Sequence, residues 1–322
     1  MQGKIIKLLY NAQDYVSGQQ MSDSLGVSRQ AINKAVKSLK EKGFKIRSVT
    51  RKGYLLEKFP AVLCEEAVKC YLNTKFIGRN LKVLDTVDST NDYLKKLAED
   101  GAEAGIVVLA REQTAGKGRL GREWVSTKDN GIALSLLLRP ELAPGEISSI
   151  TPLSGLAMCR AINDFCMLDS RIKWPNDIIV GKKKLVGILT EMAAEADRVK
   201  YTVTGIGINV KQSVFPDDIS HKATSIMLET GRHIDQNKFV AIILNYLEQE
   251  LVLNHYSLGG QAAADYQKLC ATIGRQVTFS RGKRNISGMA VSVNNSGELD
   301  VMLSNGTIAT VNSGDVTVQG IY

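Results

Sequence analysis

Residues 113–124 have the sequence QTAGKGRLGREW, and residues 116–121 match the G-x-G-x-x-G pattern of dinucleotide-binding loops. In a dinucleotide domain the third glycine opens a helix, and an acidic residue ends the next strand about twenty positions later. Here residues 122–131, REWVSTKDNG, have the composition of a loop instead. The stretch therefore predicts a flexible glycine loop whose backbone N–H groups and cations suit an acyl or phosphoryl anion. Without other motifs, a mobile basic surface loop would explain the same residues.

The segments around this loop alternate between strand and helix patterns. Strands are predicted at 81–87, 106–110, 132–138, 177–180, 185–192 and 199–210, and helices at 61–76, 92–99, 148–165 and 237–254. This order favours a mixed sheet in an α+β arrangement over a doubly wound parallel sheet.

Short strands separated by turns are predicted for the C-terminal part of the chain. The strands are expected at 276–280, 286–293, 299–303, 307–311 and 316–319, with turns at Asn295-Ser296-Gly297, Ser304-Asn305-Gly306 and Ser313-Gly314-Asp315. The pattern predicts a small SH3-like β-barrel.

The whole net positive charge of the chain lies in its first sixty residues. The 322 residues include 41 Lys and Arg against 33 Asp and Glu, a net charge of +8. Residues 1–60 contain 12 basic and 4 acidic residues, whereas residues 61–322 contain 29 of each. This distribution excludes a uniformly basic enzyme and a basic C-terminal tail. It indicates one small N-terminal module with a polyanionic partner.

The N-terminal module has the pattern of a winged helix-turn-helix. Ser17 and Gln20 have capping-box spacing, Gly26 offers a left-handed helix end, and Ser28 can cap the next helix. Strands at 44–49 and 54–57 predict a basic hairpin. A small helical domain with a solvated lysine face is the alternative, but the coincidence of charge, capped helices and hairpin favours DNA. The residues expected to contact duplex DNA are Ser28, Arg29, Gln30, Asn33, Lys34, Lys37, Arg51 and Lys52.

The composition excludes several other classes of protein. Hydrophobic residues make up 44% of the chain and charged residues 23%, which argues against wholesale disorder. The sequence contains no 18-residue apolar run and no signal-peptide pattern, so a cytoplasmic protein with no membrane partner is expected. The five cysteines lack the spacing of metal ligands, which predicts reduced thiols and no protein-held metal site.

Three further motifs accompany the glycine loop: Ser89-Thr90-Asn91, KWPND at 173–177, and Lys184 with Gly187 followed by 205–210. Each alone has a structural explanation as a helix cap, a proline turn or a buried strand. Together, and with the helix-turn-helix, they make the chain resemble the bacterial bifunctional biotin protein ligases that also repress the biotin operon. The chain departs from that family at Leu120, where a second basic residue is frequent, and it has Lys117 where arginine is also found.

The resemblance implies three domains and a two-step reaction. The domains are a winged helix-turn-helix (1–60), a biotin- and ATP-binding ligase domain like class II aminoacyl-tRNA synthetases (61–270), and an SH3-like domain (271–322). Biotin and Mg-ATP give biotinyl-5′-AMP, which a lysine of a biotin carboxyl carrier protein then attacks. Biotinyl-AMP also acts as corepressor, because it promotes a homodimer that binds double-stranded operator DNA.

The chemistry of this reaction assigns roles to the motif residues. A carboxylate that attacks a phosphate needs cations, for which Lys184 and Arg119 are the catalytic candidates. Lys184 is preferred over Lys182 and Lys183 because it directly precedes a buried strand. The predicted biotin-binding residues supply hydrogen bonds to the ureido ring and contacts to the rest of the biotin molecule. They are Ser89, Thr90, Asn91, Gln113, Lys117, Gly118, Arg119 and Lys184.

The predicted nucleotide- and adenylate-binding residues are Gly116, Arg122, Trp124, Asn176, Asp177 and Asn209, with the division of roles between Asn176 and Asp177 left open. The loop 116–122 is expected to shield the adenylate from water. The segment 214–221 either orders over the adenine or is an ordinary connection.

Two other functions fit parts of the sequence. A ligand-sensing transcription factor without ligase activity would not need Lys184 or the glycine loop. A lipoate-protein ligase would share the catalytic core, but the N-terminal module and KWPND favour biotin.

Overall fold

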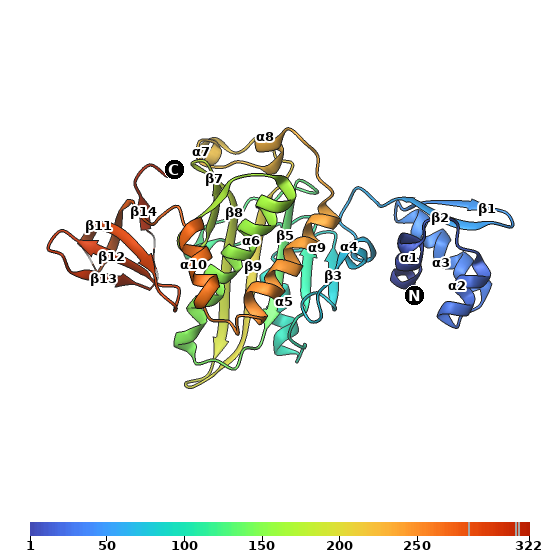
Figure 1. Ribbon diagram of the computed structural model, residues 1–322, viewed down its shortest axis with the longest axis horizontal. Coiled ribbons are helices and arrows are strands. Elements are labelled where there is room, and N and C mark those ends of the chain that lie inside the picture. Colours follow the sequence, from blue (N-terminus) through green and yellow to red (C-terminus); the bar gives the residue numbers. More distant parts are fainter. Residues whose placement is uncertain (283, 313, 315) are drawn as a thin grey trace. The chain divides into compact units, whose positions relative to one another are not determined.

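The computed structural model describes residues 1–282, 284–312, 314 and 316–322, and it divides into two compact units (Figure 1). Unit 1 contains Met1–Asn73 and Asp235–Ile242, and unit 2 contains Thr74–Ile234 and Ile243–Tyr322. Ser313 and Asp315, two of the residues of the last predicted turn, lie outside the described residues.

Unit 1 contains the predicted helix-turn-helix and hairpin. Its elements are α1 (Gln2–Asn11), α2 (Gly18–Leu25), α3 (Arg29–Glu41), β1 (Lys45–Val49), β2 (Gly53–Lys58) and α4 (Glu65–Tyr71). The capping signals are confirmed: the Gln20 N–H donates to Ser17 Oγ at 3.1 Å, and the Ser17 N–H donates to Gln20 Oε1 at 2.9 Å. Helix α2 ends at Gly26 with a φ of 65°, and Ser28 Oγ caps α3.

The predicted helix at 61–76 is wrong in extent, because α4 is shorter at both ends. Asn237, far away in the sequence, binds the segment before the helix. Its Nδ2 donates to Pro60 O at 3.2 Å and to Val62 O at 3.0 Å, and its Oδ1 accepts from the Cys64 N–H at 2.8 Å. These bonds use backbone groups outside a helix, so residues 60–64 stay non-helical.

Unit 2 is built on a seven-stranded sheet in the order β3-β4-β5-β9-β8-β7-β6. The strands are β3 (Leu81–Leu84), β4 (Val107–Ala110), β5 (Gly131–Leu138), β6 (Ser170–Lys173), β7 (Asp177–Val180), β8 (Lys183–Ala194) and β9 (Val199–Asn209). The β3–β4 pair is parallel and the other described pairs are antiparallel, which confirms the mixed sheet. The strand predicted at 81–87 ends at Leu84, and β6 was not predicted.

Helices α5 (Thr90–Glu99) and α6 (Ile150–Cys166) cover opposite faces of this sheet. Successive residues of a strand point to opposite faces. In β8, Thr190 Oγ1 accepts from Thr151 Oγ1 of α6 at 2.9 Å. The next residue of the strand, Glu191, accepts through Oε1 from Lys95 Nζ of α5 at 2.9 Å. Leu94 of α5 packs in a buried cluster on its own face of the sheet.

The rest of unit 2 adds short helices and an antiparallel C-terminal sheet. The helices are α7 (Asp217–Ser220), α8 (Ile226–Thr230) and α10 (Gly260–Leu269), which was not predicted. The predicted helix at 237–254 consists of α9 (Gln236–Leu247), which begins in unit 1, and a π-helical turn at Glu248–Val252. The C-terminal strands are β10 (Gln276–Arg281), β11 (Arg284–Val293), β12 (Leu299–Leu303), β13 (Ile308–Val311) and β14 (Val316–Val318), in the order β13-β12-β11-β10-β14.

Trp174 attaches the C-terminal sheet to the central one. Its side chain is 2% exposed, and its Nε1–H donates to Gly297 O in the predicted turn after β11 at 2.9 Å. Its backbone N–H donates to Thr272 Oγ1 at 3.0 Å. The tryptophan of the KWPND motif is therefore an anchor between the two sheets.

None of the helices in the described part of the chain has both the length and the apolar character to cross a bilayer.

Candidate active site

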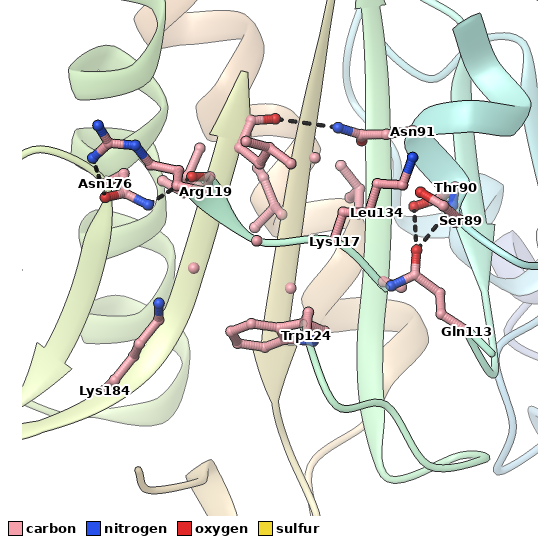
Figure 2. Close-up of a pocket in the computed structure, with 18 residues that line it drawn as sticks. Ser89, Thr90, Asn91, Gln113, Lys117, Arg119, Trp124, Leu134, Asn176 and Lys184 are labelled. Carbon is pink, nitrogen blue, oxygen red and sulfur yellow. Dashed lines mark hydrogen bonds between the residues drawn. The ribbon is translucent and has the colours of Figure 1, made fainter. Parts of the chain in front are cut away.

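A pocket with an empty volume of about 470 Å³ lies on the α5 face of the central sheet (Figure 2). Gly187 of β8 and Gly205 and Gly207 of β9 form its floor, and Gly187 pairs with Gly207. A Cβ at Gly205 would lie 2.3 Å from Asn91 Oδ1, and one at Gly207 would lie 2.4 Å from Trp124 Cε2. Asn91 and Trp124 therefore approach the backbone as closely as only glycine permits.

The pocket brings together residues that are far apart in the sequence. All eight predicted biotin-binding residues line it: Ser89, Thr90, Asn91, Gln113, Lys117, Gly118, Arg119 and Lys184. Trp124 and Asn176 from the predicted nucleotide set line it as well. Figure 2 shows Lys184 and Arg119 toward one end and Thr90, Ser89 and Gln113 toward the other. Gly116, Arg122, Asp177 and Asn209 are not among the lining residues and lie around the pocket.

The Ser89–Asn91 motif forms the start of α5. The Thr90 N–H and hydroxyl group both donate to Gln113 Oε1, each at 2.9 Å. These two bonds turn the Gln113 oxygen toward α5 and its Nε2 away from Thr90. This end of the pocket is therefore built from oriented donors and acceptors, the kind of lining that recognises a neutral polar ring.

Ser135 completes this end of the pocket and was missed by the sequence analysis. Its Oγ is buried in β5, 2.7 Å from Thr90 Oγ1 and 2.6 Å from Asn91 Oδ1. Because Asn91 Oδ1 can only accept, the Ser135 hydroxyl proton belongs to that contact, and the Thr90 hydroxyl proton is then shared between Ser135 Oγ and Gln113 Oε1. The one available signal was a single hydroxyl in the otherwise apolar stretch GIALSLLL at 131–138.

The glycine loop folds as a short hairpin at 116–124. The Trp124 N–H donates to Gly116 O at 2.9 Å, and the Gly118 N–H donates to Arg122 O at 2.7 Å. At the tip, Leu120 and Gly121 have φ values of 56° and 74°, the signs found in two-residue type I′ hairpin turns. The glycine loop therefore has the backbone of a hairpin, with Leu120 and Gly121 at its tip.

Two of the three cations of this hairpin, Lys117 and Arg119, contact different elements. Lys117 Nζ lies 2.6 Å from Asp92 Oδ2 of α5. Arg119 Nη1 donates to Asn176 Oδ1 at 3.0 Å, and its Nη2 donates to Gly314 O at 3.2 Å. Both contacts bring positive charge from the hairpin to the pocket lining.

Lys184 lies inside β8 and lines the pocket, whereas Lys182 and Lys183 are exposed. Its Nζ is 2.6 Å from Asp177 Oδ1 and 5.6 Å from the centre of the Trp124 ring. Figure 2 shows the ammonium group pointing into the pocket. The expectation that one lysine of this run faces the site agrees with this placement.

The backbone of Lys184 binds the segment that follows β9. Its N–H donates to Lys222 O at 2.7 Å, and its carbonyl accepts from the Thr224 N–H at 2.9 Å. Asn209 Nδ2 donates to Thr224 O at 3.0 Å. These bonds fasten the residues directly after the segment 214–221 beside the catalytic candidate, and α7 lies within that segment.

The KWPND motif supports the pocket from its outer side. Asn176 Nδ2 donates to Ile188 O at 2.9 Å, which leaves its Oδ1 directed at Arg119. The Tyr322 hydroxyl group donates to Asp177 Oδ2, and Lys173 Nζ lies 3.8 Å from the centre of the Tyr322 ring. The motif therefore holds both cationic candidates, Arg119 through Asn176 and Lys184 through Asp177.

Clusters of metal-ligating side chains and reactive thiols are two other kinds of functional group. Over the described residues, no group of three or more His, Cys, Asp or Glu side chains is arranged around a possible metal ion. The five cysteines are not in disulfides, and burial raises the pKa of Cys64, Cys159 and Cys166 to about 12. Thiols with a raised pKa are poor nucleophiles, so they fit a structural role.

Family comparisons match three parts of the chain. Residues 83–209 match the biotin/lipoate A/B protein ligase family, residues 2–55 match an HTH domain, and residues 272–318 match the biotin protein ligase C terminal domain.

Individual relatives agree with these matches. The bifunctional ligase/repressor BirA of Bacillus spizizenii is 41% identical over 238 residues, 73% of each chain. The protein of the same name from Escherichia coli is 29% identical over 317 residues, 98% of this chain and 96% of that one. The biotin protein ligase of Aquifex aeolicus, solved with biotin and ATP, aligns with a TM-score of 0.64 and 27% identity over 75% of this chain and 99% of that chain. The chain belongs to the biotin protein ligase family, in the group of bifunctional ligase/repressor proteins.

Proposed function

We propose that this protein is a biotin protein ligase and a biotin-responsive repressor. As a ligase it activates biotin with ATP and transfers the biotinyl group to a lysine of a biotin carboxyl carrier protein. As a repressor it binds operator DNA that controls biotin synthesis or transport genes. The observation that carries the proposal is the convergence of eight predicted biotin-binding residues on one pocket, with hydrogen-bonding groups at one end and cations at the other.

The geometry accounts for the first chemical step. The ureido ring of biotin binds among Thr90, Gln113 and Asn91, and its carboxylate extends toward Lys184 and Arg119. A carboxylate oxygen forms a bond to the α-phosphorus of ATP while the bond to the β-phosphate oxygen breaks, which releases pyrophosphate. Lys184 and Arg119 lower the repulsion between the two anions. The hairpin and the Trp124 ring exclude water from the mixed anhydride.

The second step needs an incoming amine and a leaving group. The carrier lysine attacks the acyl carbon, the bond to AMP breaks, and the amine proton leaves with solvent. Mg²⁺ fits this site as a partner of the ATP phosphates, because Mg²⁺ in proteins is held by one or two carboxylates plus substrate phosphates. Asp177, whose carboxylate lies beside Lys184, is the residue that would hold it. Bound there, Mg²⁺ would neutralise phosphate charge.

The DNA-binding function rests on unit 1. All eight predicted DNA-contacting residues are exposed: Ser28, Arg29, Gln30, Asn33, Lys34, Lys37, Arg51 and Lys52. Helix α3 presents five of them, and Arg51 and Lys52 lie in the turn between β1 and β2. We propose that α3 enters the major groove and that the hairpin is the wing. A homodimer would place two copies of α3 on the half-sites of an operator.

The finer structural assignments are part of the same proposal. We divide the chain into a winged helix-turn-helix domain (1–60), a ligase domain like class II aminoacyl-tRNA synthetases (61–270) and an SH3-like domain (271–322). A cytoplasmic location is proposed with them, since carrier protein and operator are both found there.

The first test measures ATP–pyrophosphate exchange with biotin, with lipoate and with neither acid. We expect exchange that depends on biotin, because Thr90, Gln113 and Asn91 match a ureido ring and not a dithiolane. Preferred exchange with lipoate would identify a lipoate ligase. Tight binding of biotin without exchange would identify a sensor that lacks ligase activity.

The second test measures the salt dependence of binding to duplex DNA from the promoter of the protein's own biotin genes. If the five basic residues Arg29, Lys34, Lys37, Arg51 and Lys52 each neutralise one phosphate, the logarithm of the binding constant falls with the logarithm of salt concentration with a slope of about −4 to −5 per protomer. Lys34→Ala is expected to reduce that slope by about 1. Lys182→Ala, an exposed lysine of unit 2, serves as the control. Binding that is insensitive to salt would contradict the assignment.

A further inference from the structure

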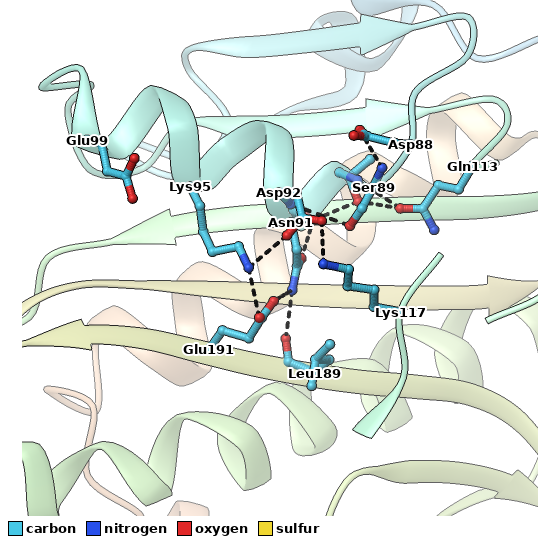
Figure 3. Close-up of polar contacts among 12 residues, drawn as sticks. Asp88, Ser89, Asn91, Asp92, Lys95, Glu99, Gln113, Lys117, Leu189 and Glu191 are labelled. Carbon is cyan, nitrogen blue, oxygen red and sulfur yellow. Dashed lines mark hydrogen bonds and ion pairs between the residues drawn. The ribbon is translucent and has the colours of Figure 1, made fainter. Parts of the chain in front are cut away.

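The hydrogen-bonding end of the pocket is backed by a cluster of charged residues, of which only Lys117 was predicted from the sequence (Figure 3). Asn91 is 4% exposed, and its Nδ2 donates to Glu191 Oε2 at 2.7 Å and to Leu189 O at 3.3 Å. Its Oδ1 accepts from Ser135 Oγ at 2.6 Å and lies over Gly205 on the pocket floor. Both N–H bonds of the amide are thus directed at β8.

These partners permit one orientation of the Asn91 amide. A rotation by 180° would place Oδ1 against the Glu191 carboxylate and the Leu189 carbonyl, and neither of these groups can donate a hydrogen bond. At Ser135 either orientation can form a hydrogen bond, because the hydroxyl group both donates and accepts, so Glu191 and Leu189 are the groups that decide the orientation. An unpaired or repelled polar group is costly when it is buried. The amide therefore faces the pocket floor with its oxygen, and one lone pair of that oxygen remains after Ser135.

Glu191 is itself held by α5 and, through it, by the glycine hairpin. Lys95 Nζ lies 2.9 Å from Glu191 Oε1 and 2.7 Å from Asp92 Oδ1, and Asp92 Oδ2 lies 2.6 Å from Lys117 Nζ. Partial burial opposes ionisation of Asp92, but hydrogen bonds from Lys117 and Lys95 outweigh it and lower the pKa of Asp92. Burial likewise opposes the charge of Lys95, and its bonds to Asp92 and Glu191 outweigh it and raise the Lys95 pKa. The contacts within the cluster therefore favour the charged forms of Asp92 and Lys95.

We propose that Glu191 is a positioning residue that determines ligand selection: it fixes the Asn91 amide so that the pocket offers a hydrogen-bond acceptor, which selects a ring carrying an N–H donor. The inference rests on the proposed function, because the ureido group of biotin has such a donor. A dithiolane ring has none, so lipoate gains nothing from this orientation. Glu191 acts through Asn91 and does not need to touch the ligand.

The first experiment measures binding of biotin and of lipoate to the full chain by titration calorimetry. In Glu191→Ala the Asn91 amide loses the shorter and charged of the two partners that distinguish its ends and keeps the 3.3 Å bond to Leu189 O, and biotin is expected to bind about tenfold more weakly or worse. Binding of lipoate and the KM for ATP in the exchange reaction are expected to stay unchanged, which a general structural defect would not allow. Glu99→Ala removes the same charge and is the control, because Glu99 is an exposed residue at the end of α5 and lies apart from the cluster.

A second pair of variants tests the orientation directly. Asn91→Asp places a carboxylate oxygen against Glu191, so biotin binding is expected to weaken. Adding Glu191→Gln supplies an N–H donor to that oxygen while the other oxygen still faces the pocket, so the double variant is expected to recover about tenfold in affinity. A double variant no better than Asn91→Asp, or an unchanged biotin affinity in Glu191→Ala, overturns the proposal. Failure of the ligase function is a separate result, namely biotin binding without exchange in the unmodified protein.

Discussion

Replacing Lys184 with alanine is expected to lower biotin-dependent ATP–pyrophosphate exchange about 10²- to 10³-fold, the usual effect of removing one preorganised group that stabilises developing charge. The Lys184 ammonium lines the pocket and points into it. Without it, the biotin carboxylate and the α-phosphate lose one of their two cations, and the Asp177 carboxylate loses its ion-pair partner. The rate of exchange at saturating biotin and ATP is the measurement.

Lys182→Ala is the matched control for this prediction. Lys182 belongs to the same run of three lysines and carries the same charge, but its side chain is exposed and it is not among the lining residues. Its replacement is expected to leave the exchange rate within about twofold, as for a surface substitution that removes no specific contact. Equal activity of the two variants would remove Lys184 from the mechanism.

Gly207→Ala is expected to weaken biotin binding about 10- to 100-fold, because overpacking a filled site costs about 1–3 kcal/mol. The added Cβ would lie 2.4 Å from Cε2 and 2.7 Å from Nε1 of Trp124. The ring must then shift from its place beside Lys184. Titration with biotin measures the effect, and thermal unfolding of the same variant shows whether the rest of the unit remains intact.

Gly145→Ala is the control for the glycine prediction. A Cβ at Gly145 meets nothing within 4 Å, and Gly145 lies in the same unit but away from the pocket lining. It is expected to bind biotin as the unmodified protein does. If Gly207→Ala also kept full affinity, Trp124 would have no part in shaping the pocket.

Features formed by residues close together in the sequence were predicted correctly, whereas features that depend on distant residues were not. The caps at Ser17 and Ser28 and the left-handed end at Gly26 involve neighbours within five positions, and all three are confirmed. The mixed sheet was predicted from apolar strand patterns, which also involve only neighbouring residues. The helix expected at 61–76 failed because Asn237, more than 170 positions away, binds its first residues.

The same distinction applies to the pocket. The residues assigned to biotin from the sequence belong to motifs, and a motif is recognised by the spacing of its residues along the chain. Ser135 and Glu191 lie inside strands and outside these motifs, 44 and 100 positions from Asn91, and the folding of the sheet against α5 brings them to it. Patterning alone assigns such residues to strands and does not reveal their partners.

Trp174 connects the stability of the C-terminal sheet with that of the pocket. Its indole N–H is satisfied by a carbonyl of the C-terminal sheet, and its neighbour Asn176 holds Arg119 at the pocket. Loss of the C-terminal sheet would expose a large apolar ring and leave its N–H group without that acceptor, next to the residues that form the site. The central and C-terminal sheets are therefore expected to unfold together, and removal of the C-terminal segment is expected to disturb the pocket as well.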